Sequence, residues 1–221
     1  MKKRNFSLQG IILEIIIVII GISIAFWLNN WGEERKERAL EIEFIKALRS
    51  DLATDSVAFA TQVKYNKEGF RHLNRFIDIL RTKDYDNDSI PWFVGNFLNR
   101  NNWILNTNTY DILKSGGKLD VISDFQLRNE MSVFYNMRGY QTNMVLDVFQ
   151  KFIDNQMNPY LAKNTNYMIS YNPDIEFVRD TEFQNLLVIW TDYTDFKLSV
   201  YEGTLEEIGK LMKEFDAHLS N

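Results

Sequence analysis

An apolar run near the start of the chain is its strongest pattern. Residues 11–28 are almost all apolar or small, and Glu14 is their single charged position. At about 1.5 Å per residue the run covers about 27 Å as a helix, close to the roughly 30 Å hydrocarbon core of a bilayer. The pattern predicts a transmembrane helix over residues 11–31, a tail over 1–10 and an extramembrane body over 32–221.

The pattern after this run is typical of a long helix. Residues 33–81 contain no proline and a single glycine, and apolar residues recur at steps of three and four. Two heptad series carry the repeat, namely Ile42, Arg49, Ser56, Val63, Phe70 and Ile77, and Ile45, Leu52, Phe59, Asn66, Leu73 and Leu80. This seam is either the core-facing stripe of an intramolecular bundle or, in part, a contact with another subunit. If the helix continues through Gly32, it forms a rod of about 75 residues and about 110 Å.

Turn residues divide the rest of the body into four further helices. We expect short helices over about 90–100 and 109–115, and long helices over about 124–162 and 181–218. The expected N-caps are Ser89, Thr109, Ser123 and Asp180. We therefore predict an all-α fold in which a single N-terminal transmembrane helix continues into an elongated extramembrane helical bundle.

A cleaved signal peptide and a buried core helix are alternatives to a retained anchor. Lys2, Lys3 and Arg4 form a basic start, and the run contains a small-x-small site at Ser23–Ala25. The run is, however, longer than the usual 7 to 15 apolar residues of a signal peptide. A type IV pilin leader is a further alternative, but Glu14 follows Gly10 one position too early for the pilin spacing.

The aromatic and charged flanks bear on the orientation of the anchor. Trp27 and Trp31 stand where interfacial anchors belong. Three basic residues precede the apolar run and three follow it at 35–38, so the number of basic residues does not decide the orientation. Only the second group is mixed with acids. We expect the N-terminus in the cytoplasm of a bacterium and the body in the periplasm, beyond the inner membrane. The absence of cysteine agrees with either compartment.

Small residues share one face of the predicted membrane helix with its acid. At about 100° per residue, this face spans an arc of about 60°. It comprises Gly10, Glu14, Gly21, Ala25 and Gly32. Gly21-x-x-x-Ala25 has the spacing that lets two membrane helices approach closely. We expect this face to meet another transmembrane helix, although Glu14 is also near enough to the end of the run to reach the headgroups.

The sequence contains little that indicates catalysis or a cofactor. There are two histidines, His72 and His218, and no cysteine, so we expect no metal site and no cofactor. The segment 84–89 is interpreted as a solvated turn rather than a calcium loop, because the required glycine and glutamate are missing. A formal charge of −5 and no basic stripe argue against nucleic acid as a partner. We do not expect an enzyme.

Two segments resemble a family of small single-pass membrane proteins of Gram-negative bacteria that carry a domain of unknown function. The first segment matches at Glu14, Gly21, Asn29, Asn30, Trp31, Glu33, Glu34, Arg35 and Lys36. The second segment matches at Tyr110, Leu113, Lys114, Ser115, Gly116, Gly117, Lys118, Leu119, Ile122, Leu127 and Arg128. Gly116 replaces a serine of the family pattern, and Trp27 replaces a polar residue. The resemblance implies a membrane-tethered helical protein and supplies no activity.

The leading functional hypothesis is an interaction protein. We expect a membrane-anchored helical scaffold or accessory subunit that assembles with itself or with another membrane protein. The alternative is an extracytoplasmic sensor or ligand-binding module, whose small-molecule ligand the sequence does not identify. Its pocket would lie near Trp92, Trp103, Tyr110 and the turn at Gly116–Gly117.

Overall fold

The all-α prediction is confirmed. A computed structural model describes residues 8–98, 101–165 and 175–220, without the side chains of residues 8–12. Helices make up 87 % of the described residues, which contain no strand. The basic residues at 2–4 and Arg100 lie outside the described residues.

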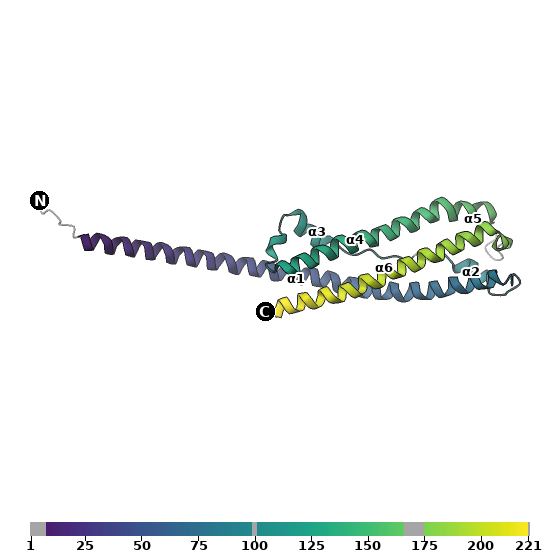
Figure 1. Ribbon diagram of the computed structural model, residues 1–221, viewed down its shortest axis with the longest axis horizontal. Coiled ribbons are helices and arrows are strands. Elements are labelled where there is room, and N and C mark those ends of the chain that lie inside the picture. Colours follow the sequence, from purple (N-terminus) through teal and green to yellow (C-terminus); the bar gives the residue numbers. More distant parts are fainter. Residues whose placement is uncertain (1–7, 99–100, 166–174, 221) are drawn as a thin grey trace.

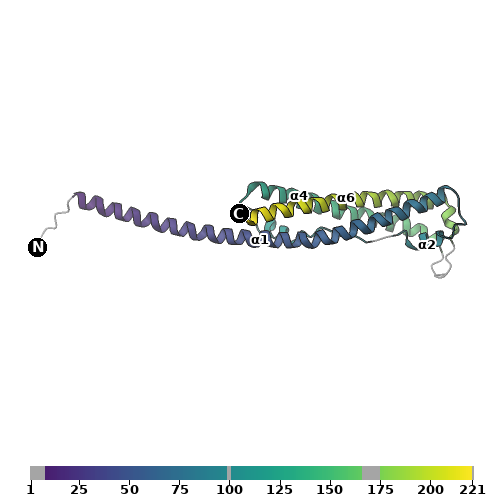
Figure 2. The same ribbon diagram turned by 90° about the horizontal axis from the view of Figure 1, so that it is seen from below.

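The helix α1, Leu8–Arg81, is the longest element of the molecule. Its 74 residues form one unbroken α-helix that passes through Gly32, about 110 Å long at 1.5 Å per residue. Its first part projects alone from the bundle, and its second part forms one side of the bundle (Figures 1 and 2). The apolar segment, residues 13–31, and the side of the bundle that α1 forms are therefore parts of a single helix.

Three long helices form the bundle. The helix α4, Phe125–Phe152, runs in the same direction as α1, and α6, Thr181–Ser220, runs back against both (Figure 1). The helix α6 packs mainly on α1 and next on α4. The C-terminus consequently returns to the near end of the bundle, where α1 enters it; the far end is where α1 stops.

The core of the bundle is centred on one of the two predicted heptad series of α1. Its members are at most 4 % exposed, namely Ile45, Leu52, Phe59, Asn66, Leu73 and Leu80. The members of the other series are only half-buried. Across the interface, the ring of Phe59 meets that of Tyr201 on α6 at 5.2 Å between centroids. The seam is thus covered within one chain.

The short helix α2, Ile90–Asn96, is shorter than the expected 90–100. Ser89 stands at its N-cap position, but its side chain makes no capping hydrogen bond. At the other end, the carbonyl oxygen of Phe97 accepts a hydrogen bond from the indole Nε1 of Trp190 at 2.8 Å. This bond ties the C-cap residue of α2 to a buried residue of α6.

The short helix α3, Asn108–Ser115, begins after Thr107 rather than after Thr109. Thr109 lies inside the helix, and its hydroxyl donates to Asp51 of α1 at 2.5 Å. The expected stop at Gly116–Gly117 has a clear geometry: Gly117 has φ 63°, and the N–H of Lys118 donates to Leu113 O at 2.8 Å. These are features of a Schellman C-cap, which needs a left-handed residue and favours glycine there.

The helix α4 is capped by Asp124 rather than by the expected Ser123. The Asp124 carboxylate accepts from the N–H groups of Gln126 and Leu127, whereas Ser123 donates to Glu41. Asp180 caps α6, as expected. Its carboxylate accepts a hydrogen bond from the N–H of Glu182 at 3.0 Å. Two short 3₁₀ turns precede these helices, Leu119–Val121 and Glu176–Arg179.

The helix predicted over 124–162 is interrupted near Pro159. A π-helical turn, Ile153–Met157, follows α4, and α5, Asn158–Asn164, completes the arm. Proline lacks an N–H group and its ring crowds the preceding turn, so a wider turn ahead of Pro159 relieves the conflict without ending the helix. The loop 172–174 that was expected to follow lies outside the described residues.

Candidate functional site

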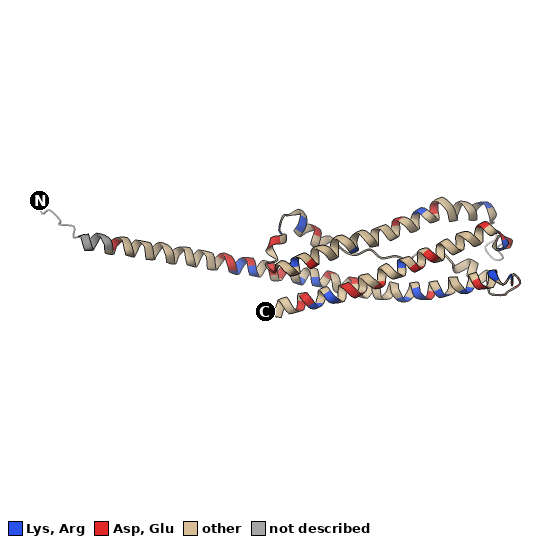
Figure 3. Cartoon of the chain, in the orientation of Figure 1, with Lys and Arg blue, Asp and Glu red and all other residues tan. Residues whose placement is uncertain are grey.

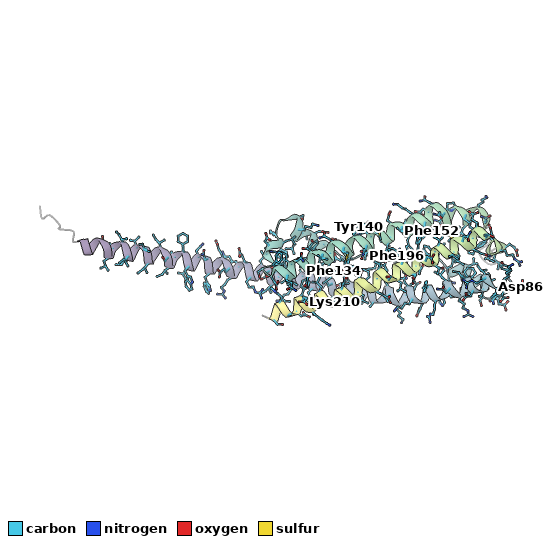
Figure 4. The ribbon with its side chains drawn as sticks, in the orientation of Figure 1. Asp86, Phe134, Tyr140, Phe152, Phe196 and Lys210 are labelled. Carbon is cyan, nitrogen blue, oxygen red and sulfur yellow. The ribbon has the colours of Figure 1, made fainter. Side chains whose placement is uncertain are left out.

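The apolar segment of α1 is covered by no other described part of the chain. Its large apolar side chains are between 46 % and 67 % exposed, and they project on all sides of the helix (Figure 4). Figure 3 shows a long uncharged stretch of α1 outside the bundle. This is the one helix among the described residues that is long and apolar enough to cross a membrane.

The predicted small-residue face lies on this bare part of the helix. A methyl group added at Gly21 or Gly32 would meet no described atom within 4 Å. Glu14 and Ala25 are exposed as well. Gly10 is part of α1, but the side chains around it lie outside the described ones. No described part of the chain therefore covers this face.

The aromatic and amide positions at the end of the apolar segment are also exposed. Trp27 is 66 % and Trp31 48 % exposed, and the guanidinium of Arg35 lies 5.0 Å from the centre of the Trp31 ring. Asn29 and Asn30 are exposed. An amphipathic indole beside a cation suits a boundary between an apolar and an aqueous phase.

A buried carboxylate ties the three long helices together at the near end. Glu41 of α1 is 2 % exposed and accepts hydrogen bonds from the Ser123 N–H and hydroxyl, at 2.7 and 2.8 Å. Arg38 donates to it at 2.7 Å, and Nε2 of His218 on α6 lies 3.1 Å away. Burial acts to raise the pKa of Glu41, but the hydrogen bonds from Arg38 and Ser123 hold it below its ordinary value.

The family-like segment at Lys114–Gly117 packs α3 onto α4 at this same end. Nζ of Lys114 donates to Asn136 at 2.8 Å, and the Ser115 hydroxyl bonds to the Asp111 carbonyl of its own helix. The rings of Tyr110 and Tyr135 stack at 4.7 Å. Together with the glycine turn, these contacts give the segment a structural role.

A strap of irregular chain returns from the far end to the near end between α2 and α3. Its described part, residues 101–107, is held by buried side chains of the long helices. Asp55, fully buried, accepts from Nε1 of Trp103 and from the N–H of Asn106, both at 2.9 Å. Tyr201 accepts from the Trp103 N–H at 2.9 Å and donates to its carbonyl oxygen at 3.0 Å.

A buried lysine lies beneath this strap. Lys197 of α6 is 1 % exposed. Its amino group donates to Asn101 O at 3.4 Å and to Asn102 Oδ1 at 3.2 Å and lies 4.4 Å from the centre of the Phe149 ring. Burial lowers the pKa of Lys197 to about 8, because the charged form loses its hydration. The amine is thus still mainly protonated at neutral pH, but it loses its proton at a lower pH than an exposed lysine does.

A cavity of about 420 Å³ opens at the far end, between α1 and α2 with one residue of α6. This volume lies within the range of about 300 to 1,000 Å³ typical of small-molecule sites. Aromatic and amide side chains dominate the lining, which consists of Tyr65, Asn66, Glu68, Gly69, His72, Leu73, Phe76, Trp92, Phe93, Gly95, Asn96, Phe97, Leu98, Asn101 and Thr194.

The structure separates the residues proposed for a ligand pocket. Trp92 lines the far-end cavity, but Trp103 is held by Asp55 in the strap. Tyr110 and the glycine turn belong to α3 at the near end (Figure 1). His72 also lines the cavity, 5.0 Å from the Trp92 ring, and no cluster of three metal-ligating side chains occurs among the described residues.

Sequence reasoning missed the buried polar groups Asp55 and Lys197. A signal for Lys197 exists, because its position continues the steps of four and three that link Trp190, Thr194 and Tyr201 on α6. A charged residue in phase with a buried stripe is a sign of a functional or structural polar contact. Its strap partners come from far along the chain, and no local pattern reveals them.

The fold defines an all-helical protein with one candidate membrane span and a far-end cavity. Residues 14–192 match the model of a family of unknown function, DUF6090, so the chain belongs to this family. The matched region includes most of the apolar segment, the strap, and the cavity lining except Thr194. No curated protein and no solved structure matches the chain.

The lowered pKa of Lys197 predicts a pH-dependent stability. The folded pKa of about 8 lies below the ordinary value of 10.5, so the unfolded chain binds more protons between these values and stability rises with pH across that window. Relative to Lys197→Met, the free energy of unfolding of the wild type should gain up to about 3 kcal/mol, at about 1.4 kcal/mol per pKa unit. Urea unfolding of the detergent-solubilised chain, followed by circular dichroism from pH 7 to 10.5, measures this gain.

The exposed Lys213 provides the matched control, because Lys213→Met removes a charge from the same helix in water. The stability difference between this variant and the wild type should stay flat over the window. A flat difference for Lys197→Met as well would contradict the assignment.

Proposed function

We propose that this protein is a membrane-anchored scaffold or accessory subunit that assembles with itself or with another membrane protein. The observation that carries the proposal is the unbroken helix α1, whose apolar segment is exposed on every side while its second half is built into the bundle. Such a helix holds the body at a fixed distance from the bilayer. It also offers a bare face to a second membrane helix.

The proposed contact is the face formed by Gly10, Glu14, Gly21, Ala25 and Gly32. Lipid tails are as apolar as isoleucine, so membrane helices associate through close packing and polar contacts rather than through hydrophobic burial. Small residues permit that close approach. An acid within a bilayer is costly, by about 2.5 kcal/mol or more at the centre, and a hydrogen-bonding partner helix reduces this cost.

Replacing Gly21 by isoleucine should weaken this association. The branched side chain would separate the two helices at the point of closest approach. We expect at least a fivefold loss of oligomer or of co-purified membrane partner, measured by chemical crosslinking in isolated membranes. Ser23→Ile adds similar bulk on the opposite face, about 200° away, and should leave association unchanged. Equal crosslinking of all three proteins would contradict the proposed face.

We further propose that the N-terminus lies in the cytoplasm and the body in the periplasm, with the apolar segment in the bacterial inner membrane. A basic tail without acids precedes the segment, and its positive charge favours retention on the cytoplasmic side. The exposed tryptophans at 27 and 31 would lie at the opposite interface.

Alkaline phosphatase fused after residue 221 should test this orientation, because the enzyme folds only where disulfides form. An active fusion is expected. A fusion that is well expressed but inactive, together with a fluorescent cytoplasmic reporter at the same position, would reverse the orientation.

A second candidate function is an extracytoplasmic ligand-binding module. The far-end cavity supports it, because a concave site with aromatic walls and a few polar groups is typical of small-molecule recognition. The cavity lies at the opposite end of the bundle from the apolar segment. The long helix α1 lines it and would connect a ligand to the membrane.

A further inference from the structure

We propose that the far-end cavity binds a small organic ammonium ion with an apolar body; this inference rests on the ligand-binding function proposed above. Three features of the lining support it: aromatic walls, oxygen acceptors, and an acid without a lysine or arginine beside it in the described lining. Each feature comes from different side chains.

The walls of the cavity are a connected set of aromatic rings. Phe76 of α1 stacks on Phe93 of α2 at 5.3 Å between centroids, and the Trp92 ring meets the Phe93 ring edge-on at 5.1 Å. Trp92 and Tyr65 remain 49 % and 44 % exposed, so their rings are accessible to a ligand. Indole and phenol faces attract cations within about 6 Å, and tryptophan does so best.

The polar side chains that line the cavity offer oxygen atoms. Nδ2 of Asn66 donates to Gln62 O at 2.7 Å, and Nδ2 of Asn96 donates to Trp92 O at 2.8 Å. The hydroxyl hydrogen of Thr194 is engaged in the same way, by the carbonyl one turn earlier on its helix. The side-chain oxygens therefore remain as acceptors for a ligand with N–H groups. Asn66 is 1 % exposed, so such a bond would form away from bulk water.

The charge of the lining favours a cation over an anion. Glu68 is the one acidic residue of the described lining, and this lining contains no lysine or arginine. The nearby amine of Lys197 is not part of the lining, because it points to Asn101 O and Asn102 Oδ1. A carboxylate or phosphate ligand would meet Glu68 without a lysine or arginine in the described lining to compensate, whereas an ammonium group would be attracted to Glu68.

Three probes of nearly equal shape separate the charge from the ring: benzylammonium, benzyl alcohol and benzoate. The full-length protein is labelled with 5-fluorotryptophan and placed in nanodiscs of uncharged lipid, and the ¹⁹F resonance of Trp92 is followed as each probe is added. The resonance is assigned with Trp92→Phe. Benzylammonium should shift it saturably, with a Kd at least fivefold below those of the other two probes.

Two acid variants test the role of Glu68. Glu68→Gln should weaken benzylammonium binding about threefold, which is the effect of a partly exposed ion pair. Glu43→Gln removes an exposed acid from the same helix, far from the cavity, and should have no effect. Equal effects of the two variants would overturn the role of Glu68 and with it the proposed charge preference.

The results with the three probes distinguish the ammonium assignment from the ligand-binding function on which it rests. If benzyl alcohol or benzoate binds as tightly as benzylammonium, the ammonium assignment fails and the ligand-binding proposal stands. If none of the three probes shifts the Trp92 resonance saturably, both proposals fail.

Discussion

The continuous backbone hydrogen bonding of α1 is the constraint on which the rest of the structure depends. A helix pairs the backbone N–H and C=O groups of the apolar segment within the segment itself, as a hydrocarbon surrounding would require. In the bundle, the buried stripe from Ile45 to Leu80 requires the same helical geometry. The intervening residues 32–40 are mostly glutamate, arginine, lysine and alanine, which favour helix. Gly32 alone opposes it, at a cost of about 1 kcal/mol. The two halves of α1 therefore act as one rigid rod.

The body depends on a second constraint, the pairing of its buried polar groups. Asp55, Lys197 and Tyr201 bond to the backbone or the amide and indole groups of the strap, so both donors and acceptors of the strap are paired where it crosses the bundle. These bonds tie the strap, residues 101–107, to α1 and α6. At the near end, Glu41 serves the same purpose for α4 and α6. The far-end cavity lies where this polar framework gives way to aromatic packing.

Much of the fold follows from local pattern, and the site does not. The steps of three and four along α1 and α6 predict both helices because burial acts on one face of each. The turn at Gly117 is predictable because few other residues adopt its left-handed geometry. The cap at Asp124 was missed because Ser123 is an equally good capping residue by type, and its contact with Glu41 is long-range. The cavity brings residues near 66, 92 and 194 together, which no sequence periodicity reveals.

The rigidity of the join between the apolar segment and the bundle is tested most directly by one distance measurement. Because the chain has no cysteine, spin labels can be placed through V18C and V57C, at positions 58 % and 71 % exposed. Double electron–electron resonance in nanodiscs should give a narrow distribution centred at about 58 Å, the rise of a straight helix between these residues. A broad distribution, or a maximum well below about 50 Å, would show a flexible joint and contradict the continuous rod.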